Sequence, residues 1–305
     1  MSFNLILRSM RERRDWHGSR GKRLSYAIKY AARCLTHVSA QANWLRFIYD
    51  SPRMSAIHAR DPYLFDRPLH RYISRSFSAN QRYATMLSHY RFVSSQLPTV
   101  LIDTLYRDGQ VTLGQVSLKD NSLLLVKLAL PAGRGREGEL CLQLTNAQGD
   151  VLSSLIFTVG DEGHSLLIGC LQGASSQLGR DAVRTLTKQC HGLRPKNLLF
   201  SMLLGFAQDR GMARVRGISQ AAHPFSLTRG KIKADYDSFW IECSGVLNKD
   251  GFYDLPAREP VRDEMQVESK HRSAFRKREV LRWEATHLFV DALRGYAEHV
   301  TRKAA

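Results

Sequence analysis

The spacing of apolar residues along the chain changes near residue 100. This change constrains the fold more than any other feature of the sequence. From residue 111 to about residue 171, apolar runs of one strand's length alternate with turn-forming residues. The runs are VTLGQVSL, SLLLVKLAL, ELCLQLTN, VLSSLIFTV and HSLLIGCL. Gly, Asp and Asn between such runs are typical of tight connections between neighbouring strands. This part of the chain therefore predicts an antiparallel β-meander.

A helical period follows the meander. SSQLGRDAVRTLTKQC and RPKNLLFSMLLGFAQDRG have apolar residues three and four apart, and the second opens on Pro195, a residue favoured in a first helical turn. ARVRGIS and GFYDLP predict two more short strands, and a long amphipathic helix starts near SKHRS. The predicted fold class is α+β: an antiparallel sheet with packed helices, preceded by a helical N-terminal region and followed by the long C-terminal helix.

We expect three parts along the chain. Residues 1–105 form a basic helical region, and residues 106–260 form the α+β domain. Residues 261–305 form a C-terminal amphipathic helix that packs on this domain. Within the first part, an apolar stripe from Leu24 to Ile48 predicts one helix whose opposite face is basic. A second helix is predicted to begin after an N-cap serine at position 78 and to end before a proline at position 98.

The charge of the chain is strongly positive. There are 45 Lys and Arg residues against 28 Asp and Glu, which gives a formal net charge of +17. Residues 1–107 hold 18 of the basic and 6 of the acidic side chains, so most of the excess lies there. Such an excess favours a polyanionic partner: an anionic membrane surface, nucleic acid or an acidic protein. Because no helix-turn-helix, RNA-binding or zinc-finger signature accompanies it, sequence-specific DNA is not an expected partner.

The cysteines and the apolar runs indicate the cellular compartment. The five cysteines are scattered and never form a C-x-x-C pair, which argues against a disulfide framework and a structural zinc site. No run approaches the roughly 18 to 20 apolar residues of a membrane span, and the first residues lack the pattern of a secretory signal. We therefore expect a reduced, metal-free, cytoplasmic protein, with peripheral association at the inner membrane as an open alternative.

The segment AAHPFSLTRGKIKADYDSFW, residues 221–240, concentrates residue types that carry chemistry. It follows the predicted strand ARVRGIS, and functional side chains commonly gather in loops beyond strand ends. Pro224 biases His223 towards an extended conformation, and an imidazole with an ordinary pKa of about 6.5 can act as a general base. Asp235 or Asp237 can orient it, and we predict His223 and Asp237 as the catalytic pair. A structural role for the histidine is the alternative.

Cations and aromatic rings accompany this pair. The predicted anion-binding residues of the same segment are Arg229, Lys231 and Lys233. Cations at a helix N-terminus oppose its dipole unless an anion lies there, which adds two candidates from the preceding helix, Arg194 and Lys196. The predicted pocket residues are Phe225, Tyr236, Phe239 and Trp240. The last three share one helical face, so core packing is the alternative to a ligand pocket.

The string HPFSLTRGKIKADYDSFW, together with GMARVRGIS and LRPKNLLFSMLL before it, resembles the VirK/YbjX family of bacterial proteins. The resemblance covers most of the chain, through about residue 260. It implies a cytoplasmic protein linked to virulence, envelope integrity, envelope stress and resistance to antimicrobial peptides. It implies no established reaction, and no catalytic residue is carried over from the family.

The predicted order of strands and helices also resembles that of the GNAT acyltransferases. In that fold, a helix after the fourth strand holds the pyrophosphate of an acyl carrier on its exposed N–H groups. The matching segment is residues 171–181, which departs from the family's spacing but contains Gln172, Gly173, Ala174 and Gly179. The resemblance implies acyl-CoA or an acyl carrier protein as the donor. An ordinary loop with a serine N-cap is the alternative.

Two functions of different classes follow from these patterns. The first is acyl-transfer-like modification of an anionic envelope component by the segment 221–240. The second is a non-catalytic binding factor that assists the production or surface localisation of a virulence protein through its basic helices. The basic stretch KHRSAFRKRE of the last helix either binds anionic groups or only solubilises the helix, and both interpretations stay open.

Overall fold

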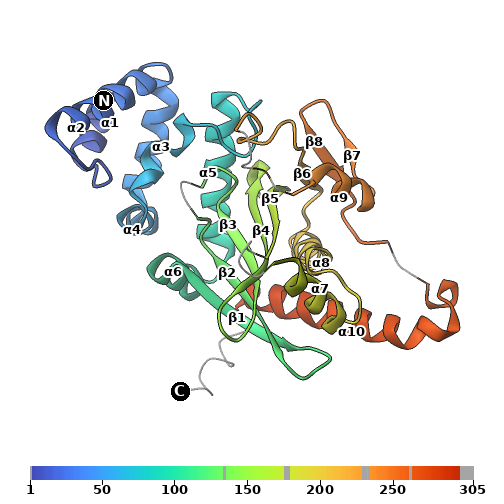
Figure 1. Ribbon diagram of the computed structural model, residues 1–305. Coiled ribbons are helices and arrows are strands. Elements are labelled where there is room, and N and C mark those ends of the chain that lie inside the picture. The colour runs from blue at the N-terminus through green and yellow to red at the C-terminus, as the bar shows by residue number, and fades with distance from the viewer. Residues whose placement is uncertain are drawn as a thin grey trace.

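The computed structural model describes residues 2–132, 135–174, 179–228, 232, 234–260 and 263–295. Within these residues, helices precede, connect and follow the strands of one eight-stranded sheet (Figure 1). The N-terminal helices are α1 (Ser2–Arg11), α2 (Arg20–Leu35), α3 (Val38–Asp50), α4 (Pro52–Arg60), α5 (Ala79–Gln96) and α6 (Thr99–Asp108). The later helices are α7 (Gly179–Gln189), α8 (Pro195–Asp209), α9 (Tyr236–Glu242) and α10 (Ser269–Arg294).

The sheet confirms the predicted meander and the α+β fold class. Its strands are β1 (Gln110–Ser117), β2 (Leu123–Ala129), β3 (Leu140–Thr145), β4 (Val151–Gly160), β5 (Ser165–Gly173), β6 (Arg214–Ile218), β7 (Val246–Leu247) and β8 (Phe252–Leu255). Their order is β1-β2-β3-β4-β5-β6-β8-β7. Within the described chain, β5 and β6 are parallel neighbours and the other neighbours are antiparallel. A parallel pair needs a long crossover, and α7 and α8 supply it.

The N-terminal helices differ from the prediction in one respect. The stripe from Leu24 to Ile48 does not form one helix, because the chain breaks between α2 and α3. The hydroxyl of Thr36 donates to the carbonyl of Arg33 at 2.7 Å, which offers the last turn of α2 a local partner in place of a continued helix. Leu45 and Ile48 are buried in α3, whereas the α2 part of the stripe is exposed.

Two predicted helix starts are confirmed. Ser78 is the N-cap of α5, and with Gln81 it forms a capping box in which each side chain satisfies a backbone N–H group of the other residue. Pro195 lies in the first turn of α8, as expected from its fixed φ and missing N–H. The leucines, methionine and phenylalanines of α8 are buried almost all around the helix, so it lies inside the molecule.

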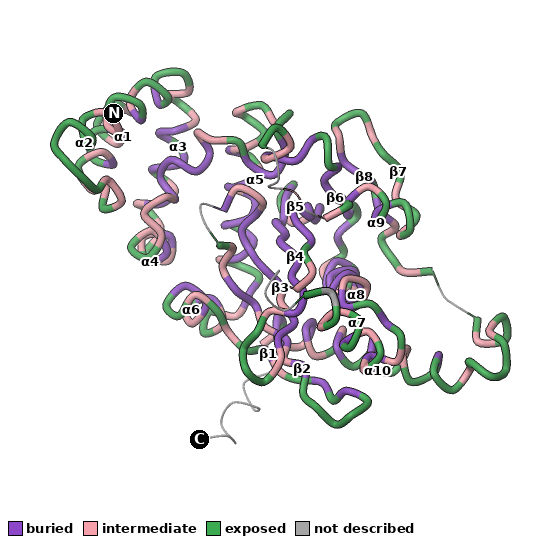
Figure 2. Tube along the Cα trace, viewed as in Figure 1, coloured by how far each residue is buried: buried purple, intermediate pink, exposed green. Residues whose placement is uncertain are grey.

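The two faces of the sheet are buried against different partners. On the first face, Phe157 of β4 packs on Phe206 of α8, which packs in turn on Phe289 of α10. One cluster of buried apolar side chains extends from Ile6 in α1 to Leu293 in α10, which Figure 2 shows as a buried interior. On the second face, a small separate cluster consists of Ala129, Cys141, Ile156 and Cys170. None of the five cysteines, all of which lie in the described chain, forms a disulfide.

Candidate functional site

The parallel strands β5 and β6 separate where the candidate site lies. They pair only over Ser165–Ile168 and Arg214–Gly217, whereas β5 continues to Gly173 beside β4. In the described chain, the last residues of β5 therefore have no strand on the β6 side. Sites in sheets with parallel strands commonly lie beyond the carboxyl ends of the strands, at points where the topology changes.

A β-bulge at Gly169 determines which side chains reach this point. Ile156 of β4 pairs with Cys170 and Phe157 pairs with Ile168, so Gly169 is an extra residue in β5. Because side chains alternate along a strand, the extra residue turns Cys170 to the second face, and bulges commonly re-aim side chains in this way. A Cβ at position 169 would lie 1.8 Å from the carbonyl oxygen of Glu137, so only glycine lets the β2–β3 connection approach this closely.

His223 lies in the interior, with 1% of its surface exposed. Its Nδ1 accepts the N–H of Phe225 at 3.2 Å, so the neutral ring carries its proton on Nε2. Nε2 lies 3.0 Å from Oε1 of Glu137, although the pair does not have the geometry of a regular hydrogen bond. The connection that carries Glu137 is held by the N–H of Ile73, which donates to the carbonyl of Arg136 at 2.7 Å. Ile73 has a φ of 55°, an uncommon conformation for a β-branched residue.

Tyr236 joins His223 to Cys170. The rings of Tyr236 and His223 are stacked, with centroids 5.4 Å apart and planes at 17°, and Tyr236 Oη donates to Cys170 Sγ at 3.4 Å. Burial raises the pKa of the Tyr236 hydroxyl, and the nearby Cys170 raises it further. Burial and then Glu137 raise the pKa of the Cys170 thiol. Both groups therefore stay protonated, and Cys170 does not have the features of an activated thiolate. We call Glu137, Cys170, His223 and Tyr236 the His223 cluster.

The predicted pair of His223 and Asp237 is not formed. Asp237 Oδ1 accepts the N–H of Gln220 at 2.9 Å, and Asp235 caps α9 by accepting the N–H of Ser238 at 3.0 Å. The carboxylate that His223 contacts is Glu137, which lies in the β2–β3 connection. The sequence around the histidine contains no signal for this partner, because the contact depends on the bulge in β5.

The other predicted pocket residues pack around β6. Phe239 and Trp240 are buried, and Trp240 Nε1 donates to the carbonyl of Ile218 at 2.9 Å. Trp240 also lies directly over Gly217, where a Cβ would come within 2.4 Å of the indole. Phe225 is half-buried beside the guanidinium of Arg136, 5.9 Å from the ring centroid. Phe225, Phe239 and Trp240 therefore belong to the packing at the end of β6.

The predicted anion-binding residues fall into two groups. Arg229, Lys231 and Lys233 lie outside the described residues. Arg194 is the N-cap of α8, where it pairs with Glu242 and donates to Asn197 Oδ1 at 3.0 Å. Lys196 is half-buried in the first turn, and burial and the neighbouring Arg194 lower its pKa.

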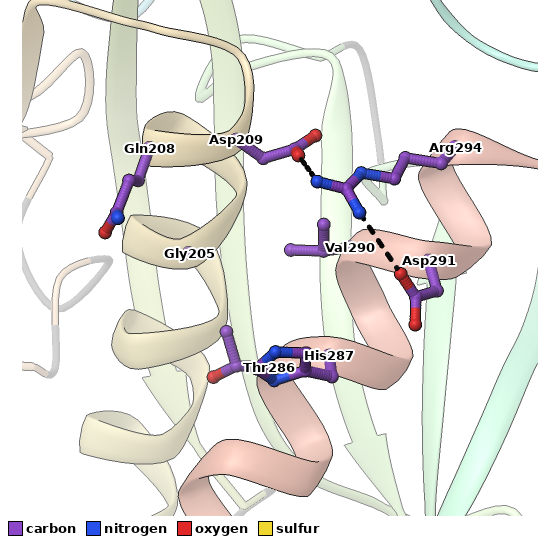
Figure 3. A pocket seen from close by; sticks show the side chains of 8 residues that line it. All are labelled: Gly205, Gln208, Asp209, Thr286, His287, Val290, Asp291 and Arg294. Carbon is purple, nitrogen blue, oxygen red and sulfur yellow. Dashed lines mark hydrogen bonds and ion pairs between the residues drawn. The ribbon is translucent and has the colours of Figure 1, made fainter.

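A pocket with a volume of about 410 Å³ lies away from the His223 cluster, between α8 and α10. Figure 3 shows Arg294 reaching across it to Asp209 of α8 and Asp291 of its own helix. The two helices meet closely here because Gly205 has no side chain. A Cβ at this position would lie 2.2 Å from Thr286 Cγ2. The carboxylates and guanidinium at this pocket are paired with one another, which is what a helix–helix contact requires.

The N-terminal end presents a different kind of surface. Three large apolar side chains of α2 are exposed along one side of the helix: Leu24, Ile28 and Leu35, at 61%, 59% and 63%. Exposed cations occupy other positions of the same helix: Arg20, Lys22, Arg23, Lys29 and Arg33. Neighbouring α1 exposes Phe3 and Leu7 at the same end of the molecule (Figures 1 and 2). We call α1 and α2 together the basic amphipathic surface.

The fold and the His223 cluster define an α+β protein with buried polar side chains where its parallel strands separate. The chain belongs to the VirK/YbjX family, because the family described as "Protein of unknown function (DUF535)" matches residues 19–283. The chain is 27% identical to the uncharacterized protein YbjX of Escherichia coli over 86% of its own length and 80% of the relative's. This finding confirms the resemblance drawn from the sequence.

Two further relatives extend the comparison. An uncharacterized protein of Haemophilus influenzae is 30% identical over 68% of each chain. A protein of Mannheimia haemolytica named "Membrane protein LapB" is 27% identical over 66% of this chain and 87% of the relative. No solved structure matches the chain. Within the described residues, no helix combines the length and apolar character needed to cross a bilayer, and no cluster of His, Cys, Asp and Glu is arranged to hold a metal ion.

Proposed function

We propose that this protein transfers an acyl group from a thioester carrier to an anionic component of the bacterial envelope. The observation that carries this proposal is the separation of β5 and β6 at the Gly169 bulge, with the His223 cluster gathered at the same place. The strand order, with a parallel pair bridged by helices and followed by a helix and two antiparallel strands, supports a GNAT-like fold.

The residues at the end of β5 and the start of α7 provide part of what is needed to bind acyl-CoA or an acyl carrier protein. The last residues of β5 offer backbone N–H and C=O groups on the side that β6 has left, and such an edge can pair with an amide-containing chain. The Tyr236 hydroxyl occupies part of that edge near the Leu171 backbone. Gly179 begins α7, whose N-terminal N–H groups suit a phosphate. Residues 175–178, where a phosphate-binding loop would lie, are outside the described residues.

The His223 cluster divides the proton transfers between two groups. The donor supplies an acyl carbon activated by its bond to sulfur. Once the Phe225 N–H leaves Nδ1, His223 accepts the proton of the attacking amine or hydroxyl at that atom, while Glu137 faces Nε2. Tyr236, which is protonated because it is buried, gives its proton to the departing sulfur, and the proton that His223 has taken then restores the tyrosine hydroxyl. Because His223 is only 1% exposed, the segment that covers it has to move when the acceptor binds.

Thiol release from acyl-CoA and acyl carrier protein, with a lipid A precursor as acceptor, tests this proposal. We expect His223→Gln to lower the rate by about 100-fold or more, which is the usual contribution of a general base. His89→Gln is a matched control, because His89 is equally buried and its Nδ1 also accepts a backbone N–H, that of Val159, at 3.2 Å. Equal rates for His223→Gln and the unmodified protein would contradict the role of His223.

We also propose, as a second function, that the basic amphipathic surface holds the protein on an anionic membrane. Exposed leucine and isoleucine beside cations are typical of helices that lie in the membrane interface. Each cation near an anionic surface contributes about 1 kcal/mol, so the charges of α2 suffice for reversible binding. The name of the Mannheimia relative, a membrane protein, supports this location. Either function would account for the roles that the resemblance implies, in envelope integrity, resistance to antimicrobial peptides and display of virulence factors.

Sedimentation with vesicles that contain phosphatidylglycerol tests the second function. We expect the double substitution Leu24→Ser and Ile28→Ser to weaken binding, because it removes apolar contacts without changing the charge. Val100→Ser is the matched control, since Val100 is 63% exposed on α6, away from this surface. Binding that is insensitive to salt would contradict the electrostatic part of the proposal.

A further inference from the structure

Three segments that are distant in the sequence meet at the carboxyl end of α7. The turn between β1 and β2 is held there by the N–H of Lys119, which donates to the carbonyl of Gln189 at 3.1 Å. The first part of α10 reaches the same place, because a Cβ at Gly192 would lie 3.8 Å from Arg278 Nη1. His191 comes between these two contacts in the chain, in a left-handed conformation with a φ of 54°.

The charges around His191 are positive. Burial lowers the pKa of its imidazole, and the nearby ammonium groups of Lys277 and then Lys119 lower it further. Both lysines are exposed, and the last turn of α7 adds Lys188 as another exposed cation. In the described chain, no hydrogen bond or ion pair engages the side chains of Lys119, His191 or Lys277. We call Lys119, His191, Lys277 and Arg278 the His191 site.

The acids next to this site in the sequence are engaged elsewhere. The Oδ1 atom of Asp120 accepts both the backbone N–H of Ser122, at 3.0 Å, and its hydroxyl, at 2.6 Å. Glu279 is shared between two guanidinium groups: its Oε1 lies 3.9 Å from Arg278 Nε, and its Oε2 lies 3.3 Å from Arg282 Nε. The positive charge at His191 is therefore not balanced by these two carboxylates.

The basic stretch KHRSAFRKRE of α10 shows the contrast within one helix. Lys270 Nζ lies 2.8 Å from Glu268 Oε2, and Arg276 Nε lies 3.2 Å from Glu264 Oε1. Lys277 instead faces cations from two other segments. Like charges that the backbone holds together repel one another, and a bound anion relieves this repulsion. At Lys277 the stretch is therefore suited to bind an anion, beyond keeping the helix soluble.

The groups of the His191 site define the anion. Ammonium, guanidinium and imidazole groups all donate to phosphate oxygens. A phosphate monoester dianion carries two charges on one compact group, so it can pair with more than one cation, whereas a carboxylate or a phosphate diester carries a single charge. The two lysines are exposed, so the site can receive the terminal phosphate of a larger molecule. We propose that the His191 site binds a phosphate monoester, either a soluble one or the headgroup of phosphatidic acid.

This proposal depends on neither proposed function, because the His191 site shares no residue with the His223 cluster or the basic amphipathic surface. Nitrogen-15 NMR of the histidine rings tests it in the full-length protein. Titration with inorganic phosphate at constant ionic strength should shift the His191 resonances and raise the pKa of this imidazole, because a nearby dianion favours the charged ring. His287, exposed on a later turn of α10, is an internal control and should not respond.

Dimethyl phosphate tests the requirement for two charges. It is a diester with one negative charge, like a phosphate of a nucleic acid backbone, and it should affect the His191 resonances more weakly than inorganic phosphate does. No response of His191 to inorganic phosphate would overturn the proposal. An equal response to dimethyl phosphate would also overturn it.

Lys277→Gln should weaken phosphate binding about tenfold, the effect of one lost hydrogen bond to a charged group. Lys277 is exposed, so the variant should fold normally. Lys249→Gln is the matched control, because Lys249 is an exposed lysine without a partner in the described chain and lies between β7 and β8. Unchanged affinity in Lys277→Gln, or an equal loss in both variants, would contradict a site at His191.

Sedimentation with vesicles that contain phosphatidic acid distinguishes the two sources of the phosphate group. The background for this experiment is the double substitution Leu24→Ser and Ile28→Ser, which weakens the contact expected from the basic amphipathic surface. In this background, a further loss of binding in Lys277→Gln but not in Lys249→Gln would identify the lipid headgroup as the ligand. Equal sedimentation of the two variants, together with the response of His191 to inorganic phosphate, would identify a soluble phosphate monoester.

Discussion

Glu137 and Glu139 lie two residues apart in the connection that leads into β3, and each supplies an acid of a different buried cluster. Glu139 pairs with the guanidinium of Arg67, which also pairs with Asp61, and accepts a hydrogen bond from Tyr90. These four residues, the Arg67 cluster, are built from opposite charges. Burial raises the pKa of Glu139, and the charge of Arg67 opposes that effect. Glu137 instead faces a histidine and groups that stay protonated.

The difference concerns what each cluster can do. A buried ion pair is costly to break, because removal of one partner leaves the other charge unpaired. The Arg67 cluster is therefore suited to fix one geometry. His223 has its proton on Nε2, beside the Glu137 carboxylate, and a histidine next to a carboxylate can exchange protons, so the His223 cluster is suited to chemistry. Substitutions in the two clusters should reveal this contrast as a difference in stability.

The largest effect is expected for Glu139→Gln. The substitution keeps the shape of the side chain but leaves Arg67 without one of its two anions, at a cost of about 3–5 kcal/mol in the free energy of unfolding. Denaturant unfolding measures this loss. Asp108→Asn is the control, because Asp108 forms an exposed pair with Arg107 and should leave the unfolding midpoint unchanged. Similar midpoints for the two variants would contradict a charged Arg67 cluster.

The next effect is expected for Gly169→Ala. The added methyl group would collide with the Glu137 carbonyl, and relief of the collision costs about 1–3 kcal/mol and moves Glu137 away from His223. Gly21→Ala is the control, because a Cβ at position 21 of α2 meets nothing within 4 Å and alanine favours the helix. Calorimetric unfolding of both variants compares them. A Gly169→Ala protein as stable as Gly21→Ala would show that the β2–β3 connection does not press on β5.

A smaller effect, visible in its pH dependence, is expected at His89. Burial, and then the charge of Arg67, lower the pKa of His89 to about 3. The unfolded chain binds this proton below about pH 6.5, whereas the folded protein does not bind it until about pH 3. Between these values, the free energy of unfolding should fall with decreasing pH, by at most about 1.4 kcal/mol per pH unit from this residue.

Unfolding measured from pH 7 to pH 4 tests this expectation. His89→Gln should reduce the slope of unfolding free energy against pH, since glutamine can still accept the Val159 N–H but does not titrate. His17→Gln, at an exposed position, serves as the control and should keep the original slope. The same slope in all three proteins would rule out His89 as the source.

The smallest effect is expected for Asp237→Asn. The amide oxygen can still accept the N–H of Gln220, so the free energy of unfolding should change by less than about 0.5 kcal/mol. Nitrogen-15 NMR of the His223 ring should also be unchanged. Glu137→Gln, by contrast, should shift the Nε2 resonance, because that carboxylate lies 3.0 Å away. A shift caused by Asp237→Asn alone would restore the pair predicted from the sequence.

The parts of the fold that local patterns encode could be predicted. The meander strands, Pro195 in α8 and the Ser78 cap depend on residues a few positions apart, and the structure confirms them. The break between α2 and α3 was missed, because Thr36 has no distinctive role in an apolar stripe that continues on both sides. Periodicity also cannot distinguish a stripe that faces a core from one that faces outward, as in α2.

The candidate site could be predicted only in part. The segment 221–240 does place His223 and Tyr236 beside the end of β6, as its position after a strand indicates. Its carboxylate partner, Glu137, comes from a distant connection, and Cys170 reaches the cluster only because of a bulge. The Arg67 cluster was missed altogether, because its members come from three separate regions and share no spacing.

The crossover between β5 and β6 also determines the order in which the molecule can assemble. The meander from β1 to β5 closes through strands that are neighbours in sequence, so little loop-closure entropy opposes it. The parallel pair joins Ser165 to Arg214 and has to wait for both intervening helices. A chain emerging from the ribosome can therefore form a folded meander while it still lacks His223 and Tyr236. Any chemistry at this place begins only after nearly all of the sheet has been synthesised.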